Sequence, residues 1–187
     1  MKTEAPTFDS VWALLQDLAK QQAETDRQIK ETGQLIKETS QQMKETDRKM
    51  GAWSTNIGAF AEEYFFNSFE NGRQNFFGEK FDEIEKNLKG FKKGFKDEYD
   101  IVLINGHSLG IIEVKFKAHE KDIPGILKKA VTFRENFPDY ANHRIYLGLA
   151  SLAFYPELED ACIKEGIAII KQVGDSVVIN DAHLKVF

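Results

Sequence analysis

The chain has 187 residues, of which 42% are hydrophobic and 12% aromatic, and its formal net charge at pH 7 is −5. This composition is sufficient for a buried core, and no apolar run approaches the ~20 residues that a membrane-spanning helix needs. The negative charge excludes a protein coated uniformly with basic surface for nucleic acid, although it allows a local basic groove. The first residues lack the features of a secretory signal, so we expect a cytoplasmic protein that does not enter a membrane.

The first 50 residues repeat at intervals of seven. Hydrophobic residues occupy one position of the heptad and threonines another, three residues later: Ile29, Ile36, Met43 and Met50, and Thr25, Thr32, Thr39 and Thr46. This pattern predicts a coiled-coil helix over residues 1–52. From residue 8 to residue 50 such a helix would be about 65 Å long, too long to bury against a domain of this size. We therefore expect a homo-oligomer, and the sequence leaves open whether it has two, three or four chains. The alternative is a single exposed helix that is stabilised by pairs of charged side chains.

Two apolar runs in the middle of the chain predict a β-hairpin. Residues 101–104 and 109–116 are rich in β-branched side chains and flank the turn 105–108, which contains an Asn-Gly pair. Two registers are open. One pairs Ile104 with Leu109, and the other closes the hairpin with a two-residue loop.

Charged residues are set into this hairpin. In the first register Asp100 lies directly across from Glu113, and in the second the two acids are diagonal neighbours on the same face. Lys115 and Lys117 share the face of Glu113 because side chains alternate along a strand. The same face also carries apolar residues, namely Val102, Ile104, Leu109 and Ile111. Both faces are thus expected to be covered, and two buried carboxylates need a cation, for which a divalent metal is suited.

After the hairpin, helical and strand patterns alternate. The pattern predicts helices over residues 122–137 and 155–165, and strands over 144–150, 167–171 and 176–179. With a helix before the hairpin, this order predicts an α/β domain with a mixed sheet and helices on both faces. Cys162 is the only cysteine, which rules out an intrachain disulfide, and its helical spacing from Leu158 indicates a core position.

A lysine-rich segment precedes the hairpin. Lys92, Lys93 and Lys96 alternate with phenylalanines there, a combination that can hold a phosphate backbone and stack on bases. Together with Lys117 they are our candidate contacts for nucleic acid. The alternative is a solvated loop whose phenylalanines pack back into the core.

Asp100 and the later Glu113-Val114-Lys115 resemble the signature of the PD-(D/E)XK nuclease superfamily, whose domains have the restriction-endonuclease-like fold. The residue before Asp100 is Tyr99 where the signature has proline, a departure common in this superfamily. The resemblance covers residues 53–187 and is nearest to small bacterial proteins that join a coiled coil to such a domain. It implies an α-β-β-β-α-β core around a mixed central sheet.

The resemblance also implies an active site. Asp100, Glu113 and the carbonyl of Val114 would hold Mg²⁺ or Mn²⁺, and Lys115 would orient a water molecule or stabilise charge on the phosphate. Oxygen ligands of this kind suit Mg²⁺ or Mn²⁺ better than zinc.

A further acid often comes from the helix before the hairpin in this superfamily. Glu62 fits that position, four residues after Gly58, and Glu63 is its immediate rival. The resemblance therefore implies a metal-dependent nuclease, with DNA as the favoured substrate. The alternative is an inactive nuclease-like scaffold that binds nucleic acid or protein through a coiled-coil oligomer.

Overall fold

The computed structural model describes residues 7–72, 75–174 and 176–187 of the chain. The chain divides into two compact units, Met1–Trp53 and Ser54–Phe187. The boundary expected from the sequence lies after residue 52, and this division lies after residue 53.

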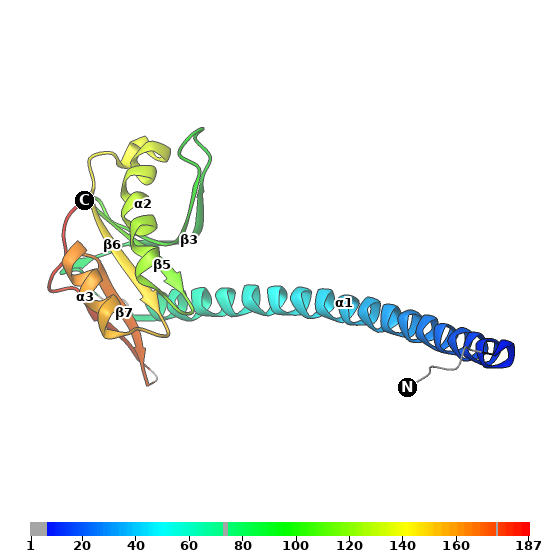
Figure 1. Cartoon of the computed structure of the whole chain (residues 1–187). Helices are drawn as coiled ribbons and strands as arrows, with labels where there is room; N and C mark the ends of the chain where they lie inside the picture. Colours follow the sequence, from blue (N-terminus) through cyan, green and yellow to red (C-terminus); the bar gives the residue numbers. More distant parts are fainter. Residues whose placement is uncertain (1–6, 73–74, 175) are drawn as a thin grey trace. The chain divides into compact units, whose positions relative to one another are not determined.

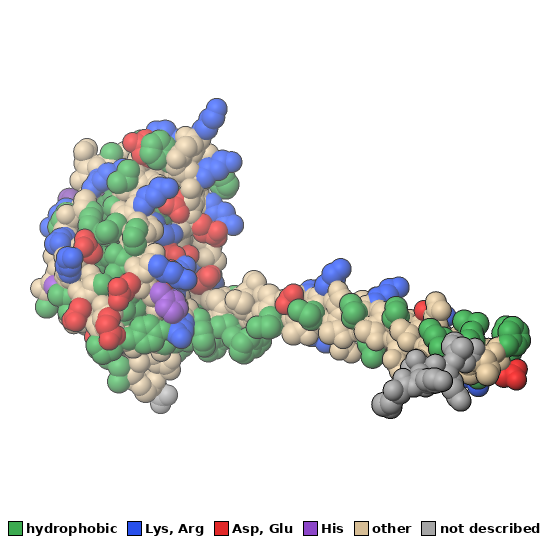
Figure 2. Space-filling model, in the orientation of Figure 1, with side chains coloured by type: hydrophobic (Ala, Val, Ile, Leu, Met, Phe, Trp, Pro, Cys, Tyr) green, Lys and Arg blue, Asp and Glu red, His purple; other side chains and the backbone are tan. Residues whose placement is uncertain are grey.

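A single long helix forms the described part of the first unit and continues into the second. α1 extends without a break from Phe8 to Gly72. Along it, the heptad residues Ile29, Ile36, Met43 and Met50 are 62–65% exposed. Hydrophobic side chains are visible along the helix in Figure 2. We call the surface formed by these residues and the threonines at the second heptad position the seam. In this chain it is a stripe on the surface of the helix.

The second unit is built on a six-stranded mixed sheet in which the strands stand in their sequence order (Figure 1). β5, β6 and β7 run parallel to one another, and the outer neighbours are antiparallel. The strands of this sheet are β3 (Glu83–Gly90), β4 (Asp97–Ile104), β5 (Ser108–Lys115), β6 (Arg144–Ser151), β7 (Ala168–Val173) and β8 (Ser176–Asn180).

The remaining elements connect or cover these strands. The helices of the second unit, besides the end of α1, are α2 (Ile123–Asn136) and α3 (Pro156–Glu165), with 3₁₀ turns at Glu120–Asp122 and Pro138–Tyr140. A separate two-stranded sheet consists of β1 (Asn75–Phe76) and β2 (Glu79–Lys80). No helix in the described ranges is both long enough and apolar enough to cross a membrane.

This architecture confirms the α/β fold class and the predicted element order. The observed helices α2 and α3 and strands β6, β7 and β8 begin and end within two residues of the predicted bounds. Counted over the six-stranded sheet alone, without the separate β1–β2 sheet, the order helix, three strands, helix, strand is that of the expected core. β3 is the one strand of this sheet that the sequence did not locate by residue.

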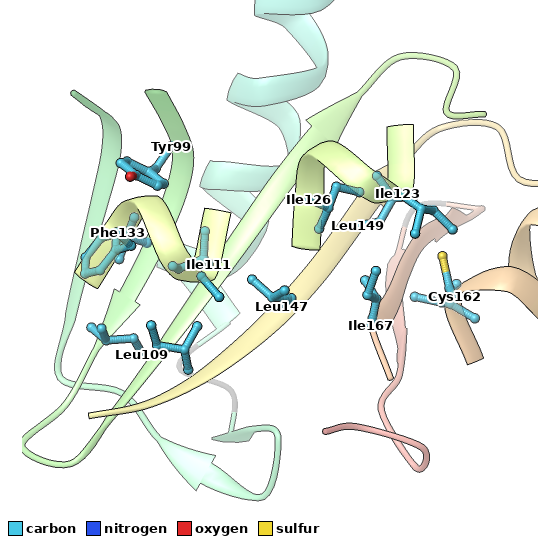
Figure 3. Close-up of a cluster of buried hydrophobic side chains, with 14 of the residues drawn as sticks. Tyr99, Leu109, Ile111, Ile123, Ile126, Phe133, Leu147, Leu149, Cys162 and Ile167 are labelled. Carbon is cyan, nitrogen blue, oxygen red and sulfur yellow. The ribbon is translucent and has the colours of Figure 1, made fainter. Parts of the chain in front are cut away.

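Two hydrophobic clusters fill the spaces on the two faces of the sheet. One cluster joins the sheet to α2 and α3 and contains Phe133 and the fully buried Cys162, as Figure 3 shows. The other joins the opposite face to α1 through residues such as Phe65, and it contains Ile112 and Val114. The hairpin is therefore covered on both faces, as expected from its apolar residues, and Cys162 is a core residue.

The β4–β5 hairpin has the first of the two predicted registers. Ile104 pairs with Leu109 and Val102 with Ile111. The turn is held by the side chain of Asn105, whose carbonyl oxygen accepts hydrogen bonds from two backbone N–H groups at 2.9 and 2.7 Å. Gly106 lacks the positive φ that a type I′ turn would require. An Asx-type turn thus replaces the two-residue Asn-Gly loop, and with it the hairpin has the register that pairs Ile104 with Leu109.

Candidate metal and phosphate site

Asp100 and Glu113 lie on neighbouring strands, one position beyond the last ladder pair of the hairpin. Glu113 is only 8% exposed. Asp100 Oδ2 accepts a hydrogen bond of 2.7 Å from the backbone N–H of Val114. Burial, and next the negative charge of Glu113, raise the pKa of Asp100 to about 7, although the Val114 hydrogen bond opposes this shift. The negative charge of Glu113 thus acts on Asp100 from the neighbouring strand.

The side-chain alternation of β4 breaks at Asp100. Tyr99 and Ile101 would share a face in a regular strand, but Tyr99 belongs to the cluster under α2 and Ile101 to the opposite cluster. On β3 the residue between the partners of Tyr99 and Ile101 is Asn87, which has a φ of 55°. This irregularity sets Asp100 at a break in the sheet instead of in a uniform ladder, as is frequent at functional sites.

Two lysines neutralise Glu113, one from its own strand β5 and one from helix α2. Lys115 Nζ lies 2.6 Å from Glu113 Oε1, and Lys129 Nζ, from α2, lies 2.7 Å from Glu113 Oε2. Burial would lower the pKa of each lysine, but the interactions with Glu113 outweigh it, so the pKa of each is raised. Both ammonium groups are thus charged at neutral pH, which balances the acid pair.

Lys129 has further partners on β4. Its ammonium contacts the backbone carbonyl of Glu98 and lies 3.7 Å from Asp97 Oδ1. The other oxygen of Asp97 accepts a 2.6 Å hydrogen bond from the Thr132 hydroxyl, one turn along α2. Helix α2 and strand β4 are therefore linked by charge at the site itself.

Sequence reasoning missed Lys129 and Asp97. Lys129 falls on the apolar face of α2, with the helical spacing of Ile126, Ala130 and Phe133, and is 8% exposed. A lysine at such a position is seldom buried without a charged partner. A lysine on the apolar face of a helix was therefore the available signal. The partner of Lys129 could not be identified from the sequence, because it depends on how α2 packs on the sheet.

The site opens into a cleft of about 410 Å³. Its lining contains five lysines and three acids: Lys96, Lys115, Lys121, Lys128 and Lys129, and Asp97, Glu113 and Asp122. The excess of lysines favours an anion in the cleft even though the whole chain is acidic.

The four lysines predicted to contact nucleic acid differ in their surroundings. Lys96 lines the cleft. Lys92 forms an ion pair of 2.7 Å with Glu135 and stands over the Phe95 ring, and Lys93 is exposed. Lys117 lies over the ring of Tyr155, 5.7 Å from its centroid. Only Lys96 of this set is therefore placed to contact an anion held in the cleft.

Glu62, the predicted third acid, is not grouped with Asp100 and Glu113. Glu62 is half-buried on α1, the helix that covers the sheet face opposite to α2. Its neighbour Glu63 forms an ion pair of 2.5 Å with Lys86, and the hydrogen bond and charge of this lysine lower the pKa of Glu63. In the described ranges, no three acid, histidine or cysteine side chains are grouped to hold a metal ion. The structure thus brings together Asp100 and Glu113 without Glu62.

The oxygen groups present fit a hard divalent cation. Glu113 Oε2 is buried and, among the described residues, has an ion-pair partner but no donor in hydrogen-bond geometry. Asp100 and Glu113 supply two carboxylates, and the Val114 carbonyl is a third candidate oxygen ligand. Mg²⁺ is commonly held by one or two carboxylates while it keeps several water molecules. The donor set is therefore appropriate for Mg²⁺ or Mn²⁺.

Comparison with known proteins adds a partial likeness. No family model and no curated protein matches the sequence. Among solved structures, the chain is similar to the small subunit of the heterodimeric restriction endonuclease R.BspD6I, with 16% sequence identity and a TM-score of 0.32. The similarity covers 63% of this chain and 71% of that subunit. At this level of likeness the site has to be judged from the residues of this chain.

Proposed function

We propose that the protein is a metal-dependent nuclease that hydrolyses phosphodiester bonds, with DNA as the favoured substrate. The observation that carries the proposal is the pair of the half-buried Asp100 and the buried Glu113, of which Glu113 lines a lysine-rich cleft. Two neighbouring buried carboxylates repel each other, and a divalent cation removes that repulsion. The lysines around them attract a polyanion. The preference for DNA rests on the resemblance to the nuclease superfamily.

Each residue has a distinct role in this proposal. Asp100 and Glu113 hold the cation, which, when bound, polarises the phosphate and lowers the pKa of a coordinated water. The backbone N–H of Val114 orients the Asp100 carboxyl through its hydrogen bond. Lys115, with 39% of its side chain exposed, can leave Glu113 to donate a hydrogen bond to a phosphate oxygen and stabilise the charge that develops there.

Cleavage assays with Mg²⁺ or Mn²⁺ and with single-stranded, duplex and branched DNA and RNA test this proposal. Glu113→Gln and Asp100→Asn keep the size of each side chain but remove a metal ligand, so we expect at least a ~100-fold loss of cleavage rate. Lys115→Met should retain metal binding and lose rate. Unchanged cleavage by Glu113→Gln would show that the activity comes from elsewhere.

Matched variants on α1 make this test specific. Glu63→Gln removes an exposed carboxylate that pairs with Lys86 outside the site, so its cleavage rate should equal that of the unmodified protein. Glu62→Gln tests whether Glu62 acts as the third metal-binding acid that the resemblance implies. A large loss of rate in this variant would show that Glu62 joins the site when metal and substrate are bound.

An inactive nucleic-acid-binding scaffold is the second candidate. Its support is that Lys115 and Lys129 already balance the charge of Glu113 without a metal. A scaffold would bind DNA equally well with EDTA or Mg²⁺ and would cleave none of the substrates. Binding that is unaffected by Glu113→Gln, together with no cleavage by any form, would favour the scaffold over the enzyme.

We also propose that the first unit assembles the protein into a homo-oligomer. Its hydrophobic seam residues are 62–65% exposed in the single chain and repeat every seven positions over four heptads. Such a stripe is stabilised when a second copy covers it by knobs-into-holes packing. Threonines at the second seam position make this association weaker than that of a leucine-rich coiled coil.

A further inference from the structure

A metal ion that binds Glu113 has to share this carboxylate with its lysine partners or displace one of them. Each oxygen of this carboxylate has its own ammonium partner, Lys115 at 2.6 Å and Lys129 at 2.7 Å. Lys115 lies at the open side of the site, with a side-chain exposure of 39%, and Lys129 is enclosed, with a side-chain exposure of 10%. The enclosed lysine therefore occupies space on the inner side of the carboxylate, where a buried cation would be held most strongly.

Lys129 has a second set of oxygen atoms within reach. Its ammonium contacts the Glu98 carbonyl and lies 3.7 Å from Asp97 Oδ1, longer than a hydrogen bond. Asp97 is fixed by the hydroxyl of Thr132, which binds the other carboxylate oxygen and leaves Oδ1 toward the lysine. A small rotation of the lysine side chain could exchange Glu113 for Asp97 without leaving the charge unpaired.

We propose that Lys129 is an internal cation that occupies the Glu113 carboxylate in the metal-free protein and moves to Asp97 and the Glu98 carbonyl when a divalent metal binds. The proposal rests on the proposed function, since it concerns the metal of that site. Lys129 is in this view a positioning residue that competes with the metal. It keeps the acid pair neutralised in the absence of metal and weakens metal binding.

Calorimetric titration of the full-length protein with Mn²⁺ tests the competition. Lys129→Met removes the ammonium but keeps most of the side-chain volume, so Mn²⁺ should bind about tenfold more tightly or better, because one repelling charge is lost near the metal. Lys128→Met is the matched control, since Lys128 is the exposed neighbour that lines the same cleft. Its Mn²⁺ affinity should change less than about threefold because exposed charges are screened.

Asp97→Asn tests the second position of the lysine and keeps the lysine itself in place. Without the Asp97 charge, Lys129 should stay on Glu113, and Mn²⁺ should bind roughly tenfold more weakly. Asp97→Asn should have a much smaller effect in the Lys129→Met background, because Asp97 acts on the metal through the lysine. The change in the logarithm of the Mn²⁺ dissociation constant should there be at most about a third of the change in the unmodified background. Additive effects of the two substitutions would overturn the exchange.

The outcomes separate the two proposals. If the unmodified protein binds Mn²⁺ and Lys129→Met binds it with equal or lower affinity, the competition is overturned. The metal site itself is then still supported. Absence of Mn²⁺ binding in the unmodified protein, Lys129→Met and Lys128→Met alike overturns the metal-dependent function and with it the competition. If Lys129→Met does not fold, as judged by circular dichroism, the affinity of Asp97→Asn decides: a value equal to that of the unmodified protein overturns the exchange.

Discussion

At the scale of single residues, Asp100 couples the stability of the protein to pH. Its pKa rises from 3.8 to about 7 in the folded chain, first through burial and then through the charge of Glu113. The folded state therefore binds a proton that the unfolded state releases. This contribution destabilises the fold progressively as the pH rises from about 4 to 7, and it reaches its full size above pH 7.

Asp100→Asn should remove this penalty in metal-free protein. The amide oxygen can still accept the Val114 hydrogen bond. At pH 8 we therefore expect the free energy of unfolding to increase by up to about 4 kcal/mol, because the shift is about three pKa units and each unit corresponds to about 1.4 kcal/mol. At pH 4 the variant and the unmodified protein should be equally stable. Urea unfolding in EDTA at both pH values measures the difference.

Asp139→Asn is the control for that experiment, because Asp139 is an exposed acid away from the site. It should leave the stability unchanged at either pH. A lower stability of Asp100→Asn than of the unmodified protein at pH 8 would mean that the charged carboxylate is favourable in the fold. That result would contradict the direction of the pKa shift.

The sequence predicted three of the residues brought together at the site. Asp100, Glu113 and Lys115 lie on one hairpin, where strand alternation determines which side chains share a face. Lys129 and Asp97 were not predicted because their meeting depends on how α2 docks on the sheet. Local periodicity places a lysine on a helix face but does not state which strand lies beneath it.

At the scale of elements, the side chain of Asn136 ties the backbone of the β3–β4 loop to α2. The Asn136 carboxamide accepts a hydrogen bond of 2.9 Å from the Lys92 N–H and donates one of 2.6 Å to the Phe95 carbonyl. Gly90, the last residue of β3, lies directly against this carboxamide. The lysine-rich segment is thus anchored at its base to the helix that supplies Lys129.

Gly90→Ala should break this anchor. A Cβ atom at residue 90 would lie 2.2 Å from Asn136 Cγ, so the carboxamide must move and lose its hydrogen bonds. We expect a loss of about 1–3 kcal/mol in the free energy of unfolding. Gly106→Ala is the control, because nothing lies within 4 Å of its added Cβ atom. Equal stabilities of the two variants in urea unfolding would show that the Asn136 contacts contribute little.

Elements with strong periodicity were predicted well, and β3 shows why the rest were not. Its sequence, EIEKNLKG, consists largely of residue types that are depleted in strands. Only Ile84 and Leu88 of its apolar side chains face the packed interior, and both are half-buried. β3 is an edge strand whose pairing with β4 determines its conformation, so its own sequence carries a weak signal.

At the scale of the whole molecule, the heptad stripe makes assembly testable. Ile36→Lys places a charge in the middle of the seam, so it should shift the protein toward monomer by at least about tenfold in dissociation constant. Gln34→Lys adds the same charge on the opposite side of the helix and should not change the assembly. Light scattering at tens of micromolar gives the mass of each form. A monomeric unmodified protein at that concentration would contradict the homo-oligomer.

The charged groups of the candidate site all lie within residues 96–129, from just before β4 to the middle of α2. Contacts that are this close in sequence cost little loop-closure entropy, so they are favoured early in folding. During synthesis, the acids and their lysines would emerge together, before β7 and β8 are available to extend the sheet. The nascent chain can therefore neutralise its buried carboxylates while the sheet is still incomplete, without waiting for a metal ion.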